Sequence, residues 1–214
     1  MNNKNKISKN GSYKELYGHF DFEKTYDYIS NILVENDIFV EVGSAWGKSA
    51  VYMMERLHQQ NKKIKFYCID IFTQAEDIDG IIFPFGIGKE YRNKMRDQTL
   101  YYDFIHNTHN SFAKDFKPIP IRTYSDLGSN IFEEETCKAV FIDAAHDYDS
   151  VKKDLESWWP KICKGGILAG HDFYGKENGR NEENGVALAV KEFLKKNNLT
   201  IDELDGTTFL IKKY

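Results

Sequence analysis

Four ionisable side chains occur in two short segments of the second half of the chain. Asp143 and His146 lie in "FIDAAH", and His171 and Asp172 lie in "AGHD". Each segment ends an apolar run typical of a buried strand, so all four are expected on loops at one edge of a sheet. Two carboxylates at neighbouring strand ends can hold a hard divalent cation, most plausibly Mg²⁺, with Asp143 and Asp172 as its ligands. Such a cation would bind both oxygens of a vicinal diol and lower the pKa of a hydroxyl.

Two other interpretations of this group remain open. In a metal-free site, His146 or His171 would be the general base, because an imidazole with a pKa near 6.5 suits that work. In a purely structural interpretation, Asp143 and His146 only form hydrogen bonds with the loop backbone. The candidate catalytic residues are therefore His146, Asp143 and His171.

A second candidate site is the segment "VEVGSAWGKS", residues 40–49, whose glycines and lysine are similar to a phosphate-binding loop. A triphosphate loop needs four residues between its first glycine and Gly-Lys-Ser, and here there are only three. The dinucleotide pattern Gly-x-Gly-x-x-Gly also fails, because position 45 is alanine. Both phosphate-binding interpretations are therefore excluded.

Two acids near this loop indicate a different ligand. Glu41 lies two residues before Gly43, and a carboxylate pointing into the loop would repel pyrophosphate and attract a cation. Asp70 ends the next predicted strand, where an acid accepts hydrogen bonds from a ribose diol. S-adenosylmethionine has a ribose, a positive charge and no phosphate, and the glycines would let the chain pass close to it. The alternative is a solvated strand-end acid followed by turn glycines.

The candidate residues are positioned by apolar runs that alternate with segments of helical periodicity. Because these runs are apolar throughout, they predict a mostly parallel sheet covered by helices on both faces, which is a doubly wound α/β fold. Asp21 is a candidate cap for the first helix, and the polar segment 174–185 is predicted to be a mobile loop. The predicted strands are 37–42, 63–70, 119–123, 138–143, 166–172, and two near 199–203 and 207–213.

Composition predicts a single cytoplasmic domain. The chain has 214 residues, a net charge of −4, and no signal-peptide-like or membrane-spanning apolar run, so neither nucleic acid nor membrane is expected as a partner. Its three cysteines form no Cys-x-x-Cys pair and are expected to be reduced. We expect a mobile tail at 1–12 and one domain at 13–214, in which 71–110 is a candidate lid over the acceptor.

Three segments carry a family resemblance: "FVEVGSAWGKSA", "FYCID" and "AVFIDAAHDYDSVKKDLESWWPKICKGGILAGHDF". They resemble class I S-adenosylmethionine-dependent methyltransferases, and more narrowly the bacterial small-molecule O-methyltransferase branch with macrocin-type and cephalosporin-hydroxylase-like proteins. The resemblance implies a Rossmann-like, seven-stranded sheet in the order 3-2-1-4-5-7-6, with the last strand antiparallel. It also implies a set of cofactor-binding residues: Glu41 and Gly43 at the methionine part, Asp70 at the ribose, Ser125 and Asp126 at the adenine, and Ser44, Gly47, Ser49, Ile71 and Asp143 around them.

The resemblance also supports the metal interpretation, since several related enzymes use an aspartate after strand four and an acidic pair after strand five. This chain departs from the Asp-Asn pair of catechol-type enzymes, with His171 and Asp172 in that place. The leading hypothesis is methyl transfer to a hydroxyl of a small molecule, such as a sugar or a sugar-bearing metabolite. N-methylation and non-catalytic binding of the cofactor or a nucleoside are the alternatives, and a homodimer is a candidate assembly.

Overall fold

A computed structural model describes residues 11–72, 99–177, 180–182 and 184–214 of the chain. The predicted tail at 1–12 lies outside the described residues except for its last two. Most of the predicted lid at 71–110 also lies outside them.

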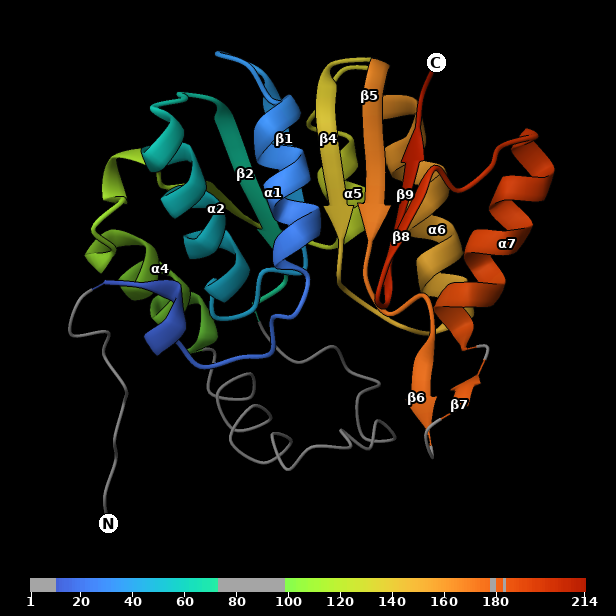
Figure 1. Ribbon diagram of the computed structural model, residues 1–214, viewed down its shortest axis with the longest axis horizontal. Coiled ribbons are helices and arrows are strands. Elements are labelled where there is room, and N and C mark those ends of the chain that lie inside the picture. Colours follow the sequence, from blue (N-terminus) through green and yellow to red (C-terminus); the bar gives the residue numbers. More distant parts are fainter. Residues whose placement is uncertain (1–10, 73–98, 178–179, 183) are drawn as a thin grey trace.

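The core of the protein is a seven-stranded sheet with the order β3-β2-β1-β4-β5-β9-β8 (Figure 1). The first five strands in this order are parallel to one another, whereas β9 is antiparallel to both β5 and β8. Counted along the chain, this is the predicted 3-2-1-4-5-7-6 order with an antiparallel last strand. The strands are β1 (Ile38–Val42), β2 (Lys65–Asp70), β3 (Ile119–Arg122), β4 (Cys137–Ile142), β5 (Ile162–Gly170), β8 (Glu203–Asp205) and β9 (Thr208–Lys212).

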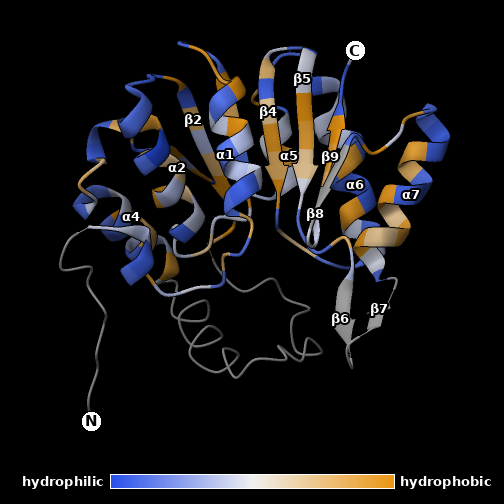
Figure 2. Ribbon diagram, viewed as in Figure 1, coloured by the Kyte–Doolittle hydropathy of each residue, from blue (hydrophilic) through white to orange (hydrophobic). Residues whose placement is uncertain are grey.

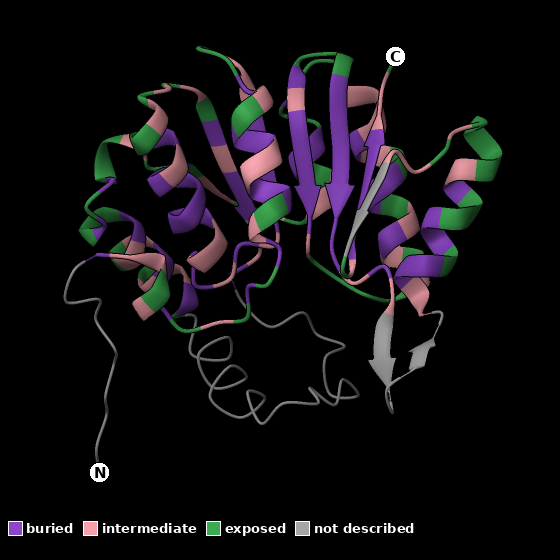
Figure 3. Cartoon of the chain, viewed as in Figure 1, coloured by how far each residue is buried: buried purple, intermediate pink, exposed green. Residues whose placement is uncertain are grey.

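Helices cover both faces of this sheet, as the uniformly apolar strands predict. Alternate residues of β1 show the two faces: Phe39 packs in the cluster with α1, α2 and α4, and Val40 in the cluster with α6 and α7. The central strands β4 and β5 are largely hydrophobic and buried, while the outer helix surfaces are polar and exposed (Figures 2 and 3). The α-helices are α1 (Glu23–Ile32), α2 (Lys48–Gln60), α4 (Leu100–Asn110), α5 (Ser125–Ser129), α6 (Tyr148–Trp158) and α7 (Gly185–Asn197).

The chain before α1 packs against the loop that follows β1. The ring of Tyr17 lies edge-on to Trp46 at 4.7 Å, and Lys48 Nζ donates a hydrogen bond to the Gly18 carbonyl at 2.9 Å. The prediction that Asp21 caps α1 is wrong, because Phe22 is the N-cap residue and no side chain caps this end.

The polar segment after β5 contains regular structure that the sequence does not predict. Strands β6 (Gly175–Glu177) and β7 (Arg180–Glu182) pair antiparallel as a separate two-stranded sheet, so the prediction of a loop over 174–185 is wrong there. Among the described residues, no helix combines the length and hydrophobicity that a membrane crossing requires.

Candidate active site

The glycines of the loop after β1 allow the protein to pack closely against itself. A Cβ atom on Gly43, whose φ is +88°, would lie 1.9 Å from the Asp143 carbonyl oxygen. A Cβ atom on Gly47, whose φ is +80°, would lie 2.8 Å from the Phe104 ring. The sequence predicts that these glycines clear space for a ligand. In the structure Gly43 instead packs against the end of β4 and Gly47 against α4. The close contact and the positive φ at each position already require glycine there.

Asp70 anchors the same loop through its side chain. Oδ2 accepts hydrogen bonds from the backbone N–H groups of Ser44 at 2.9 Å and Ala45 at 2.8 Å, and Oδ1 accepts one from Phe72 at 2.6 Å. Burial outweighs these hydrogen bonds and raises the pKa of Asp70 above its usual range. Sequence reasoning missed this anchoring role, because a strand-end acid gives no sign of which backbone it contacts.

Glu41 lies beneath the loop and does not point into it, which corrects the prediction. Val40 and Val42 point to one face of the sheet, and Glu41 points to the other face with Phe39. Helices cover that face, so Glu41 is only 1% exposed. Its Oε1 accepts a hydrogen bond from Ser49 Oγ at 2.8 Å. Burial raises its pKa to about 7.

The second oxygen of this carboxylate, Glu41 Oε2, has no hydrogen-bond partner. The same holds for two other buried atoms, Ser44 Oγ and Tyr26 Oη. Tyr26 lies on α1, and burial, together with the neighbouring Glu41, raises the pKa of its hydroxyl well above the usual value. Buried polar groups are almost always hydrogen-bonded in native proteins, so a polar ligand group or an ordered water could serve as their partner.

The predicted adenine residues lie next to the end of β2. The Thr123 N–H donates to the Asp70 carbonyl at 3.0 Å, which places the start of α5 beside Asp70. Ser125 Oγ accepts from the indole N–H of Trp158 at 3.0 Å, and the Asp126 carboxylate pairs with Lys153 at 2.7 Å. The Ile71 carbonyl accepts from Arg122 Nε at 3.1 Å.

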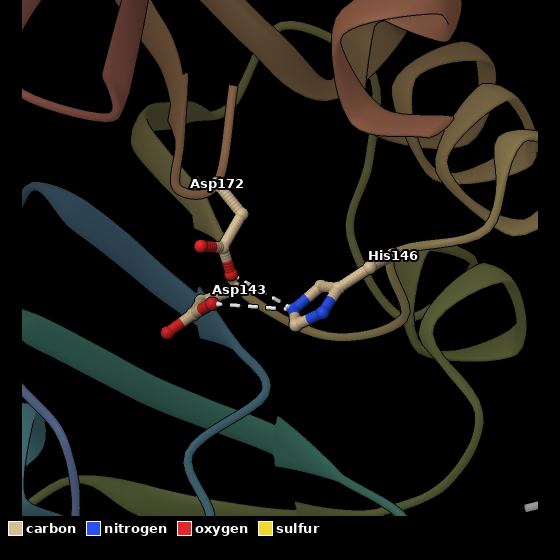
Figure 4. Close-up of side chains that lie close together, drawn as sticks. All are labelled: Asp143, His146 and Asp172. Atoms are coloured by element: carbon tan, nitrogen blue, oxygen red, sulfur yellow. Dashed lines mark ion pairs between the residues drawn. The ribbon is translucent and has the colours of Figure 1, made fainter. Parts of the chain in front are cut away.

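Asp143, His146 and Asp172 converge at the ends of β4 and β5, as predicted from the sequence. His146 Nε2 lies 3.1 Å from Asp172 Oδ2 and 3.9 Å from Asp143 Oδ1 (Figure 4). One ligand atom from each of the three residues lies within 4.8 Å of the others, which is the spacing of a metal-binding group. Asp172 has a φ of +56°, and its carboxylate faces the imidazole of His146.

His171 belongs to the same group but is buried behind it. Its side chain is 6% exposed, whereas that of His146 is 54% exposed. His171 Nδ1 lies 3.6 Å from Asp143 Oδ1 and 3.4 Å from Asp172 Oδ2. The ring lies 4.7 Å from that of Phe22. The structure therefore brings all four predicted residues together, with His146 the most exposed and His171 the most buried.

The electrostatics of this group stabilise charged forms. Burial alone would raise the pKa of Asp143, but the hydrogen bonds and charges of His146 and His171 outweigh it and hold that pKa well below its usual range. Burial lowers the pKa of each histidine, but the carboxylates of Asp143 and Asp172 outweigh it, raising the pKa of His146 and bringing that of His171 to about 10. A small pocket adjoins the group, lined also by Val151, Leu155, Val186 and Phe209.

The sheet order and a candidate site at the carboxyl ends of its strands define a Rossmann-like enzyme of the methyltransferase fold. The model of the family described as "Methyltransferase domain" matches residues 40–173, which is more than half of the chain and reaches from within β1 to just after β5. The chain belongs to this family and is an S-adenosylmethionine-dependent methyltransferase. No curated protein matches the sequence.

Solved structures show the same fold at low sequence identity. The O-methyltransferase NovP has a TM-score of 0.60 and 15% identity, with 89% of this chain and 77% of NovP covered. CalS11, a calicheamicin methyltransferase, has a TM-score of 0.51 and 16% identity, with 89% and 77% covered. SMU.1697c from Streptococcus mutans, in complex with SAH, has a TM-score of 0.50 and 14% identity, with 91% and 97% covered.

Proposed function

We propose that this methyltransferase transfers a methyl group to a hydroxyl of a small molecule, such as a sugar or a sugar-bearing metabolite. The observation that carries this proposal is the convergence of Asp143, His146 and Asp172 beside the loop at Gly43. A site that can bind and deprotonate a hydroxyl then adjoins the site proposed for the cofactor. The descriptions of NovP and CalS11 as an O-methyltransferase and a calicheamicin methyltransferase are consistent with such an acceptor.

The loop after β1 fits the amino-acid part of S-adenosylmethionine. Ser44 in the loop, and Glu41 and Tyr26 beneath it, have polar atoms without a hydrogen-bond partner, which a water between them and the ammonium group could satisfy. Asp70 Oδ2 already accepts two backbone hydrogen bonds, whereas Oδ1 accepts only the one from Phe72, so Oδ1 can accept a second one from a ribose hydroxyl. We assign the adenine to the surface around Ser125 and Asp126, beyond Ile71.

A divalent cation fits the acceptor side. Asp143 and Asp172 supply hard oxygen donors and His146 a nitrogen donor within one small volume. An octahedral ion such as Mg²⁺ or Mn²⁺ could use the carboxylates while keeping positions for water and the acceptor. When bound, S-adenosylmethionine supplies a methyl group on a cationic sulfur, and the ion supplies positive charge that acidifies the acceptor hydroxyl.

His146 is the better placed of the two candidate bases. Its half-exposed ring can reach an acceptor, and Asp172 at 3.1 Å orients it. When the acceptor oxygen bonds to the methyl carbon, the carbon–sulfur bond would break, and the hydroxyl proton would go to His146 Nδ1, because Nε2 faces Asp172. His171 is enclosed by Phe22 and its own partners, so its role is to bind and orient other groups. Alignment of oxygen and methyl carbon accounts for much of the catalysis.

The test is turnover with defined acceptors. The purified protein would be incubated with S-adenosylmethionine and a panel of glycosides, sugar nucleotides and catechols, with release of S-adenosylhomocysteine measured by mass spectrometry. We expect methylated product from hydroxyl acceptors only, loss of turnover in EDTA, and recovery with Mg²⁺ or Mn²⁺. Full turnover in EDTA with loss in His146→Ala would favour a metal-free base. Methylation confined to amines would refute the acceptor class.

A further inference from the structure

The N-terminal segment before α1 contributes a carboxylate to the candidate active site. Asp21 Oδ1 lies 3.0 Å from His171 Nε2, and Thr207 Oγ1 lies 2.8 Å from the same nitrogen. Asp21 caps no helix, and its side chain is 52% exposed. Its other oxygen, Oδ2, lies 3.7 Å from Nε2 of the exposed His19, so the contact with the buried His171 is the closer of its two ion pairs.

Packing on both sides fixes the position of Asp21. On its N-terminal side, the Gly18 carbonyl accepts from Lys48 Nζ at 2.9 Å, and the Tyr13 N–H donates to Glu55 at 2.8 Å. On its C-terminal side, the Phe22 ring stacks on Phe141 of β4 at 4.7 Å. These contacts attach the segment to α2 and to the sheet, so the approach of Asp21 to His171 belongs to the folded core.

The two imidazoles of the site face the same two carboxylate oxygens. His146 Nε2 lies 3.9 Å from Asp143 Oδ1 and 3.1 Å from Asp172 Oδ2. His171 Nδ1 lies 3.6 Å and 3.4 Å from those same atoms. Each imidazole therefore presents one nitrogen to the same pair of carboxylate oxygens.

We propose that His171 Nδ1 is a ligand of the divalent ion and that Asp21 is the positioning residue that makes it one. A histidine that binds a metal through one nitrogen usually donates its other N–H to a carboxylate, which fixes the tautomer and the ring orientation. Asp21 faces Nε2, so the Nε2–H is retained and the lone pair of Nδ1 points toward Asp143 and Asp172. The inference rests on the proposed metal site.

The ligand set has a consequence for the identity of the ion. Imidazole nitrogen suits transition metals, whereas carboxylates and waters suit Mg²⁺. With His146 and His171 beside Asp143 and Asp172, the site should bind Co²⁺ more tightly than Mn²⁺ or Mg²⁺, because affinity at nitrogen-containing sites rises from Mn²⁺ to Co²⁺.

The test measures metal binding directly, without an acceptor. Mn²⁺ would be titrated into the full chain saturated with S-adenosylhomocysteine, and pulsed EPR would detect ¹⁴N coupling from coordinated imidazole. We expect Asp21→Ala to weaken Mn²⁺ binding by about 10- to 100-fold and Asp21→Asn, which keeps an acceptor oxygen, to weaken it less. His171→Ala should lose one ¹⁴N coupling. The control Glu23→Ala removes a carboxylate two residues further along and should leave Mn²⁺ affinity unchanged.

The outcomes are distinguishable. Each variant counts as folded if its affinity for S-adenosylhomocysteine is within about twofold of that of the unmutated protein. A difference of about twofold is well under 1 kcal/mol of binding free energy. Equal Mn²⁺ affinity in Asp21→Ala and the unmutated protein, or an unchanged ¹⁴N signal in His171→Ala, would overturn the inference. If the unmutated protein binds S-adenosylhomocysteine but no Mn²⁺, the metal site itself is refuted, and this inference with it. If it binds neither, the assignment of the cofactor loop fails as well.

Discussion

Asp70 is the residue through which loop geometry and cofactor binding are most directly coupled. Replacement by asparagine leaves one acceptor oxygen in place of two. If the amide oxygen takes the place of Oδ2, the hydrogen bonds from Ser44 and Ala45 are kept and the one from Phe72 is lost. The opposite orientation loses both loop hydrogen bonds, so the first is preferred.

The expected loss of stability in Asp70→Asn follows from the number of hydrogen bonds lost. A hydrogen bond to a charged group contributes about 1.5–3 kcal/mol, so Asp70→Asn should lower the free energy of unfolding by about that amount. Loss of the charge facing the ribose should raise the dissociation constant of S-adenosylhomocysteine by about 10- to 150-fold, which corresponds to the same range of free energy. Because Asp70 is partly exposed, values toward the lower end are expected.

Calorimetric titration and urea unfolding would measure the two quantities. The matched control is Asp37→Asn: Asp37 accepts a hydrogen bond from the Val34 N–H at 2.8 Å, next to the start of β1 at the opposite edge of the sheet. This variant should bind S-adenosylhomocysteine normally.

A 2′-deoxy analogue of the ligand separates the two roles of Asp70. The unmutated protein should discriminate against the analogue, and Asp70→Asn should not. Equal ligand affinity in Asp70→Asn and the unmutated protein would refute the reasoning. Absence of discrimination by the unmutated protein would refute the ribose contact and leave the anchoring role intact.

Three further predictions concern the same loops. ATP and NAD should not displace S-adenosylhomocysteine in a competition titration, since the loop N–H groups that would bind a phosphate already donate to Asp70; displacement at comparable concentration would contradict this. Burial raises the pKa of Glu41 from 4.5 to about 7. The folded protein therefore holds a proton that the unfolded chain releases, and about 3 kcal/mol of stability, complete below about pH 4.5, should be lost as the pH rises through 7. Glu41→Gln should flatten this dependence in urea unfolding at pH 5 and pH 8, and an unchanged slope would show that Glu41 is not its cause. Asp143→Asn or Asp172→Asn should abolish turnover, because the proposed cation acts on the acceptor. The affinity for S-adenosylhomocysteine should change less than about threefold, a binding free energy of under about 1 kcal/mol. Retained turnover in either variant would exclude that residue as a metal ligand.

The convergence of the four acceptor-side residues could be predicted because it depends only on topology. Asp143 and His146 follow β4, and His171 and Asp172 follow β5, and these strands are parallel neighbours. Uniformly apolar strands predict such a sheet, and parallel strands end at one edge. No long-range information was needed beyond the order of the strands.

Other features depend on contacts between distant segments, which periodicity does not encode. Asp21 precedes a helix, as a cap would, and only the packing of Gly18 and Phe22 shows that it faces His171. The start of β5 at Ile162 was also not predicted, because Gly165 and Gly166 are typical of a turn. In the structure they lie within the strand, at an irregularity in its pairing with β4.

Asp143 connects the two halves of the proposed site. Its carbonyl oxygen fills the space where a side chain on Gly43 would lie, and its carboxylate faces both imidazoles. One residue thus fixes the distance between the loop after β1 and the group of His146, His171 and Asp172. In-line transfer depends on holding donor and acceptor within a few tenths of an ångström of the productive geometry. The close approach of Gly43 to Asp143 should therefore serve the proposed chemistry as well as the packing of the strand ends.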